Sequence, residues 1–219
     1  MSEVLEVKYP KTFLPKSYEA EIFYPESHED DMGEATIHYD LISDLLKILK
    51  LFFAEQSDIF IAANLNIYYE QNQRKRYYTP DTMVAFGVPN HKRKVYKLWE
   101  ENVFPQVIFE VASETTWKTD IGDKVEDYER LGVEEYYLLD PENAYLPMPL
   151  MAYRRDEAGR LRLVRSENDR VLSPLLNLEI VWENEKFRLF DPKAEEFLMT
   201  TEEMKAELDR LRAELKKRN

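Results

Sequence analysis

The stretch PQVIFEVASETTWKTDIGDKVEDYERLGVEEYYLLDP, residues 105–141, decides the fold. Its first part, 105–111, is a nearly continuous apolar run, which is typical of a strand covered on both faces. A helical segment over 119–131 follows and stops at Gly132, a residue suited to the left-handed backbone of a helix end. A second apolar segment, 135–140, is a further strand. Strand, helix and strand in this order predict a crossover, and hence a partly parallel sheet.

One carboxylate interrupts the first of these strands. Glu110 lies within the apolar run, where a carboxylate needs a cation, a hydrogen-bond donor or a metal ion. Lys124 and Tyr128 are four residues apart on the following helix, so both side chains project from one face. Two interpretations stay open. Glu110 and Lys124 form either an ion pair that only stabilises the fold or part of a reactive site.

The remaining segments complete a single α/β domain. The predicted elements are a helix over 33–53, strands over 60–69 and 78–88, a hairpin of 148–154 with 160–165, a packed segment over 171–180, a short edge strand over 187–190 and a charged helix over 201–218. We divide the chain into an irregular lead-in over 1–31, the main domain over 32–198 and a C-terminal helix over 199–219.

Composition narrows the class of protein. A chain of 219 residues with 44% apolar residues can bury one sizeable core. The absence of cysteine excludes disulfides, thiolate zinc sites and cysteine nucleophiles, and it fits a reducing compartment. No apolar run approaches the roughly 20 residues of a membrane helix, and the N-terminus lacks a signal-peptide core. We expect a soluble, cytoplasmic protein without a membrane partner.

Charge is unevenly distributed along the chain. The net charge of −13 argues against nucleic acid as a partner, because phosphates repel carboxylates. Residues 71–99, however, hold a single acid, Asp81, against seven bases. These bases are either solvated loop residues or a phosphate-binding rim. The residues that would contact phosphate are Arg74, Lys75, Arg76, Lys92, Arg93 and Lys94.

Asp81 is the second acid with a chemical interpretation. It follows Pro80 at the start of the strand predicted over 78–88. Two carboxylates at adjacent strand ends bind a hard divalent cation through oxygen. Such a cation stabilises charge on a phosphoryl oxygen and lowers the pKa of a bound water, while a nearby ammonium offsets developing charge. The alternative is that Asp81 only caps a turn.

Several of these positions together resemble a known family. The segment 110–113, then Asp120, Lys124 and Tyr128, and then 132–141 closely resemble the signature of the Uma-two family of restriction endonucleases, a branch of the PD-(D/E)XK nuclease superfamily. Pro80-Asp81 stands at the place of the family's first acidic motif, and 172–178 is similar to the segment after its hairpin. The resemblance covers residues 25–219 and is most specific over 110–141.

The resemblance implies a fold and a set of roles. The fold is an α/β, restriction-endonuclease-like mixed central sheet flanked by helices, with a C-terminal β-hairpin region and a terminal helix. Asp81 and Glu110 would ligate Mg²⁺ or Mn²⁺ with the backbone carbonyl of Val111, and Lys124 would be the catalytic lysine. The auxiliary positions are Glu34, His38 and Tyr128. For His38 the alternative is a helix-surface or capping histidine, and for Tyr128 it is plain helix packing.

Two departures from the family pattern bear on activity. The usual superfamily lysine lies two residues after the second acid, where this chain has Ala112, so Lys124 takes that role from the helix. Gln106 stands where relatives have an acid, which leaves Asp81 as the one acid before Glu110 in the predicted site.

The function expected from this pattern is a divalent-metal-dependent endonuclease that hydrolyses nucleic-acid phosphodiester bonds, with DNA favoured over RNA. Two alternatives stay open: a catalytically weakened nuclease fold that binds or regulates, and a protein-interaction adaptor. In the C-terminal helix, Met204, Leu208, Leu211 and Leu215 have coiled-coil spacing. This helix either associates with a partner, as in a homodimer, or packs on its own domain.

Overall fold

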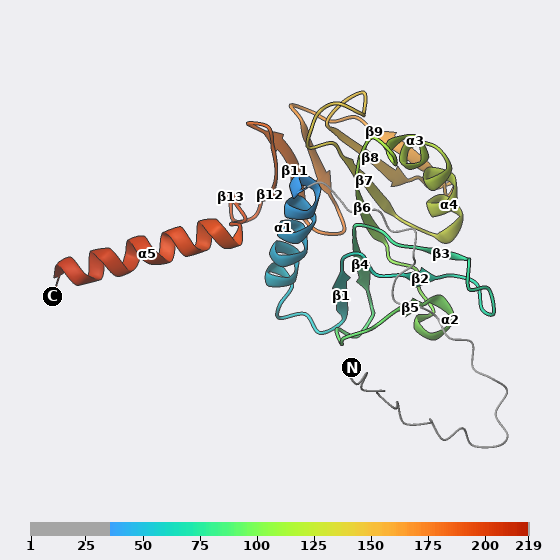
Figure 1. The fold of residues 1–219 in the computed structure, drawn as a ribbon, viewed down its shortest axis with the longest axis horizontal. Coiled ribbons are helices and arrows are strands. Elements are labelled where there is room, and N and C mark those ends of the chain that lie inside the picture. Colours follow the sequence, from blue (N-terminus) through green and yellow to red (C-terminus); the bar gives the residue numbers. More distant parts are fainter. Residues whose placement is uncertain (1–35, 219) are drawn as a thin grey trace, which may run out of the picture.

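A computed structural model describes residues 36–218, and its centre is a six-stranded mixed sheet (Figure 1). The sheet has the strand order β1-β4-β6-β7-β8-β9. Its strands are β1 (Ile59–Ala62), β4 (Thr82–Phe86), β6 (Val107–Val111), β7 (Glu135–Leu139), β8 (Leu150–Arg155) and β9 (Leu161–Val164). β6 and β7 are parallel, and the other neighbours are antiparallel. The predicted class, a mixed α/β fold, is confirmed.

Helices cover both faces of this sheet. α1 (Thr36–Phe52) buries Leu45 and Leu49 against one face, in a core shared with Phe109 of β6. α3 (Trp117–Ile121) and α4 (Asp123–Leu131) lie on the other face, where Tyr128 packs in a second core with Ile108. Successive strand residues point to opposite faces. Glu110 therefore points, like Ile108, toward α4.

The crossover between β6 and β7 forms as predicted, but its helix is divided. Gly122 separates α3 from α4, and a Cβ atom at this position would lie 3.0 Å from the backbone oxygen of Lys118. Glycine thus permits a close approach of the backbone that another residue would obstruct. Gly132 ends α4 with φ +91, as the sequence predicts.

Two predicted strands are wrong as continuous elements. The segment over 60–69 contributes β1 and β2 (Ile67–Tyr68), and the segment over 78–88 contributes β3 (Tyr77–Tyr78) and β4, in different sheets. A small three-stranded sheet has the order β3-β2-β5, with β5 (Tyr96–Lys97) leading into α2 (Leu98–Glu101). Asn64 lies in one break and Pro80 in the other, and the backbone N–H of Asn64 donates to the Pro80 carbonyl at 3.1 Å. Pro80 has no N–H that could continue a strand ladder.

A second, antiparallel sheet follows the predicted hairpin of β8 and β9. Its order is β10-β11-β12-β13, formed by β10 (Arg170–Ser173), β11 (Leu178–Glu183), β12 (Lys186–Asp191) and β13 (Glu196–Phe197). The segment over 187–190 lies in β12, an inner strand, because β13 pairs with its outer side. The prediction of an edge strand there is wrong.

Glu135 joins the two sheets. Its side chain is buried at the start of β7, where Oε1 accepts a hydrogen bond from the backbone N–H of Leu175 at 3.1 Å. Oε2 accepts hydrogen bonds from the hydroxyls of Tyr137, at 3.0 Å, and Ser173. Three donors on one buried carboxylate stabilise the contact between β7 and the segment that begins the second sheet.

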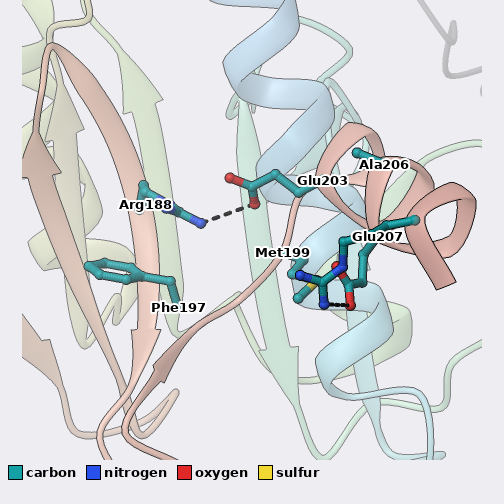
Figure 2. Close-up of a pocket in the computed structure, with 7 residues that line it drawn as sticks. Arg188, Phe197, Met199, Glu203, Ala206 and Glu207 are labelled. Atoms are coloured by element: carbon teal, nitrogen blue, oxygen red, sulfur yellow. Dashed lines mark hydrogen bonds and ion pairs between the residues drawn. The ribbon is translucent and has the colours of Figure 1, made fainter. Parts of the chain in front are cut away.

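α5 (Thr201–Arg218) begins at the second sheet and then projects away from the rest of the molecule (Figure 1). A capping box fixes its start: Thr200 Oγ1 accepts from the N–H of Glu203 at 3.2 Å, and Glu203 Oε2 accepts from the N–H of Thr200 at 2.9 Å. Glu203 also pairs with Arg188 of β12 at 3.0 Å (Figure 2). None of the helices within residues 36–218 combines the length and apolar character needed to cross a bilayer.

Candidate active site

Antiparallel pairing of β4 with β6 brings the two predicted acids together. The register matches Thr82 with Phe109, so one further step along both chains sets Asp81 opposite Glu110. Residues paired across antiparallel strands share a face of the sheet, with Cβ atoms about 4.5–5.5 Å apart. Two acids that are 29 residues apart in the sequence therefore meet where the start of β4 lies beside the end of β6.

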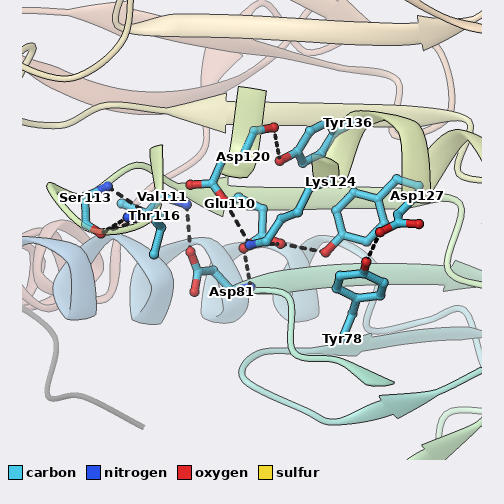
Figure 3. Close-up of polar contacts among 11 residues, drawn as sticks. Tyr78, Asp81, Glu110, Val111, Ser113, Thr116, Asp120, Lys124, Asp127 and Tyr136 are labelled. Atoms are coloured by element: carbon cyan, nitrogen blue, oxygen red, sulfur yellow. Dashed lines mark hydrogen bonds and ion pairs between the residues drawn. The ribbon is translucent and has the colours of Figure 1, made fainter. Parts of the chain in front are cut away.

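Hydrogen bonds between the two strands hold both carboxylates. Oδ2 of Asp81 accepts from the backbone N–H of Val111 at 2.7 Å, and Oε2 of Glu110 accepts a longer bond from the N–H of Asp81 at 3.4 Å (Figure 3). Glu110 is buried, and Asp81 is half-buried. In the first of these bonds Asp81 contacts a neighbouring strand, whereas a turn cap would contact its own turn.

α4 supplies the groups that contact Glu110 from the helix side. The Tyr128 hydroxyl donates to Oε1 of Glu110 at 2.6 Å, and Lys124 Nζ lies 3.0 Å from the same oxygen. The Tyr128 ring is fully buried, with its centroid 5.3 Å from that of Tyr78 and 5.0 Å from that of Tyr136. Tyr128 thus combines the packing role with a polar one, since its hydroxyl holds Glu110 in place.

Asp120 is a fifth polar member; it lies in the stretch that resembles the family signature, but no site role was predicted for it. It is buried on α3, and its Oδ1 lies 2.9 Å from Lys124 Nζ. The contact is an ion pair rather than an aligned hydrogen bond, and among residues 36–218 Oδ2 has no hydrogen-bond partner. The available signal was the spacing of four between Asp120 and Lys124, which brings two such side chains together when the helical turns are continuous.

Burial and neighbouring charges shift the pKa values in this cluster. Burial raises the pKa of Glu110, and Asp120 adds to this effect while Lys124 opposes it. Burial disfavours the charged form of Lys124, but Glu110 and Asp120 outweigh it and raise the pKa of Lys124. Lys124 therefore remains protonated at neutral pH and acts as a charge and a hydrogen-bond donor, not as a base.

The donor set fits a hard divalent cation. Asp81, Glu110 and Asp120 are three carboxylates against one ammonium, so negative charge is in excess at a largely buried place. Magnesium and manganese prefer oxygen ligands, and each carboxylate has more acceptor sites than the bonds described above use. Within residues 36–218 no group of three or more His, Cys, Asp or Glu side chains is arranged to hold a metal ion. The predicted ligand set of Asp81, Glu110 and the Val111 carbonyl has only two carboxylates, and it stays a prediction.

Comparison with known proteins identifies the family. A family model named Uma2 and described as "Putative restriction endonuclease" matches residues 28–185, which is more than half of the chain. The chain belongs to the Uma2 family. A solved structure with 13% identity and a TM-score of 0.47, covering 67% of this chain and 76% of its own, is described as a putative nuclease belonging to DUF820 from Anabaena variabilis ATCC 29413. No curated protein matches the chain.

The auxiliary positions expected on the first helix have different outcomes in this Uma2 protein. Glu34 lies outside the described residues. His38 is buried on α1, with Nε2 at 3.2 Å from Oε1 of Glu142 in the segment after β7. It is therefore neither a surface histidine nor, in the contact described, a partner of Asp81 or Glu110.

The basic cluster at 92–94 follows β4, and the structure gives its Arg93 partners other than the acids of the site. Arg93 has a buried guanidinium that bonds to Glu101 at 2.6 and 3.0 Å and lies 4.2 Å from the ring centroid of Phe60. These contacts make Arg93 a structural residue, because a guanidinium with bidentate and ring partners is not presented to phosphate.

The other basic cluster, 74–76, occupies the exposed connection between β2 and β3. β3 follows this connection, and the chain then continues through Thr79 and Pro80 to Asp81. Burial opposes ionisation of Asp127 on α4, but hydrogen bonds from Tyr78 and Arg130, together with the charges of Arg130 and Arg76, lower the pKa of Asp127. The charge of Arg76 thus acts on the helix that carries Lys124.

The two departures from the family pattern have distinct positions. Gln106 precedes β6, four residues before Glu110, and its amide accepts from the N–H of Phe86 at 2.8 Å and donates to the Phe86 carbonyl at 3.4 Å. It bridges β4 and β6 at the end opposite to the acids. Ala112 is buried directly after Val111, and the amine near Glu110 comes from Lys124.

Proposed function

We propose that this Uma2 protein is a Mg²⁺- or Mn²⁺-dependent endonuclease that hydrolyses phosphodiester bonds, with DNA as the favoured substrate. The observation that carries the proposal is the cluster in which Lys124 Nζ lies 3.0 Å from Glu110 and 2.9 Å from Asp120, beside Asp81. Membership of a restriction-endonuclease family supports a nuclease in general terms. The metal requirement and the preference for DNA are part of the proposal.

The residues of the cluster take separate roles in this mechanism. Asp81, Glu110 and the Val111 carbonyl would hold the cation, which when bound neutralises charge on the phosphate and lowers the pKa of water. Lys124 offers a fixed positive charge beside Glu110 and offsets charge that develops on the phosphate oxygens. Tyr128 and Asp120 hold Glu110 and Lys124 in place through the contacts at 2.6 and 2.9 Å.

Substrate binding is proposed to use one basic cluster rather than two. Arg74, Lys75 and Arg76 are exposed on the β2–β3 connection and precede the strand that leads to Asp81. Exposed Lys and Arg side chains bind phosphate without reading the bases, so these residues supply affinity and not sequence specificity. We leave the cluster at 92–94 out of the proposed contact surface because the guanidinium of its Arg93 is occupied by Glu101 and by the ring of Phe60.

A non-catalytic nuclease fold is the second candidate. The observations in its favour are Gln106, where relatives have an acid, and the net charge of −13. Such a protein would bind nucleic acid through 74–76 without cutting it. Plasmid nicking separates the two candidates, because the second would bind DNA without cutting it when Mg²⁺ or Mn²⁺ is added.

Nicking of supercoiled plasmid tests the proposed function. We expect Mg²⁺ or Mn²⁺ to support cutting, a chelator to abolish it, and Asp81→Ala or Lys124→Ala to reduce the rate by at least about a hundredfold. Lys118→Ala is a matched control, since Lys118 is exposed on α3 and lies near Trp117. Cutting that persists in both site variants would assign the activity to another site or to a contaminant.

A further inference from the structure

We propose that α5 pairs with α5 of a second copy of this chain as a parallel two-stranded coiled coil. Three leucines on one face of the helix are exposed although they are large and apolar: Leu208 by 47%, Leu211 by 45% and Leu215 by 61%. Their spacing of three and four, continued from Met204, is that of a coiled-coil seam. The rest of the described chain leaves this apolar face of α5 largely uncovered.

The charges beside the seam select the partner. With Leu208 and Leu215 at a positions and Leu211 at d, the residues at g are Glu207 and Glu214. The residues at e, on the other flank of the seam, are Lys205 and Arg212. One flank is thus acidic and the other basic. A helix with this pattern is complementary to itself, so a second copy is the occupant that fits.

The same charges select the orientation. In a parallel pair, each g residue faces the e residue five positions later on the other helix, which sets Glu207 against Arg212 of the partner subunit, twice per dimer. In an antiparallel pair, g faces g and e faces e, so acids would meet acids and bases would meet bases. Within one chain Glu207 contacts Arg210 at 2.6 Å and Arg212 contacts Asp209 at 3.6 Å, and both pairs are largely exposed and can exchange.

The base of α5 is built to present this seam. The capping box at Thr200 fixes the first turn, and the ion pair of Glu203 with Arg188 attaches this turn to the second sheet, while Met199 and Phe197 lie beside it (Figure 2). The later turns extend away from the body (Figure 1). A parallel pair would therefore place both bodies at the same end of the coiled coil. The pairing of α5 does not depend on the proposed function. With both, the dimer carries two nuclease sites, one in each copy.

Cysteine cross-linking of the full chain tests the parallel arrangement. The chain has no cysteine, so a single introduced thiol reports on itself alone. Leu215→Cys places the thiol at an a position, where the two copies meet at equivalent residues in a parallel pair. Ala213→Cys, on the opposite face, is the matched control. We expect Leu215→Cys to form a disulfide dimer at least about tenfold faster than the control. Equal rates, or no dimer from either variant, would overturn the proposal.

Charge reversal measured by sedimentation equilibrium over a concentration series gives an independent test. Glu207→Lys and Arg212→Glu should each weaken wild-type self-association by roughly tenfold, because two attractive pairs become repulsive. The double variant Glu207→Lys/Arg212→Glu restores opposite charges and should return to the wild-type dissociation constant. A wild-type chain that stays monomeric throughout, or a double variant as weak as the single ones, would contradict the pairing. Neither result depends on nuclease activity.

Discussion

Replacement of Glu110 by glutamine is expected to reduce the rate of plasmid nicking by at least about a thousandfold, equivalent to about 4 kcal/mol of transition-state stabilisation. Glutamine keeps the size of the side chain and an oxygen that can accept from the Tyr128 hydroxyl, which lies 2.6 Å away. It removes the negative charge that pairs with Lys124 and that would bind a cation. The measurement is the single-turnover nicking rate in Mg²⁺, with far-UV circular dichroism as the check on folding.

Glu134→Gln is the matched control for this substitution. This variant makes the same chemical change at an acid whose side chain is 46% exposed. Glu134 pairs with Arg155 at 3.4 Å, away from Asp81 and Lys124. We expect the control to cut at the wild-type rate. A Glu110→Gln variant that folds and cuts as fast as Glu134→Gln would remove Glu110 from the proposed site.

Glu135→Ala is expected to lower the free energy of unfolding by about 3 kcal/mol, a large fraction of the stability of a typical domain. The carboxylate is buried and accepts from Ser173, Tyr137 and the backbone N–H of Leu175, so its removal leaves three donors without this acceptor. Urea unfolding followed by tryptophan fluorescence gives the value.

The more conservative Glu135→Gln calibrates this loss. An amide can still accept from one or two of the donors, so we expect a cost of about 1 kcal/mol. Glu135 pairs with Val107 at the start of β6, whereas Glu110 is near its end, so the folded variants should still nick DNA at the wild-type rate. A cost for Glu135→Ala no larger than that for Glu135→Gln would show that the carboxylate does not stabilise the contact between the sheets.

Local signals in the sequence were sufficient for the centre of the fold. The apolar strand that contains Glu110, the helix that ends at Gly132 and the next strand are all present, because each depends on neighbouring residues. The breaks after Ala62 and Tyr78 were not predicted. They depend on contacts between distant segments, such as the bond from the Asn64 N–H to the Pro80 carbonyl, and no glycine marks either break.

The site shows the same division between local and distant information. The proximity of Lys124 and Tyr128 to one another follows from helical spacing, and their contact with Glu110 follows from the crossover. The ion pair of Asp120 with Lys124 crosses the break at Gly122, so a prediction of one continuous helix over 119–131 assigned no site role to Asp120. The chemical roles of these residues stay predictions.

Anomalous diffraction from crystals of the full chain soaked in Mn²⁺ tests the central claim most directly. We predict a peak between the carboxylates of Asp81 and Glu110, with oxygen ligands at about 2.0–2.3 Å that include the Val111 carbonyl, and no peak in Asp81→Ala crystals. A peak at another place, or an unchanged peak in the Asp81→Ala crystals, would contradict the account.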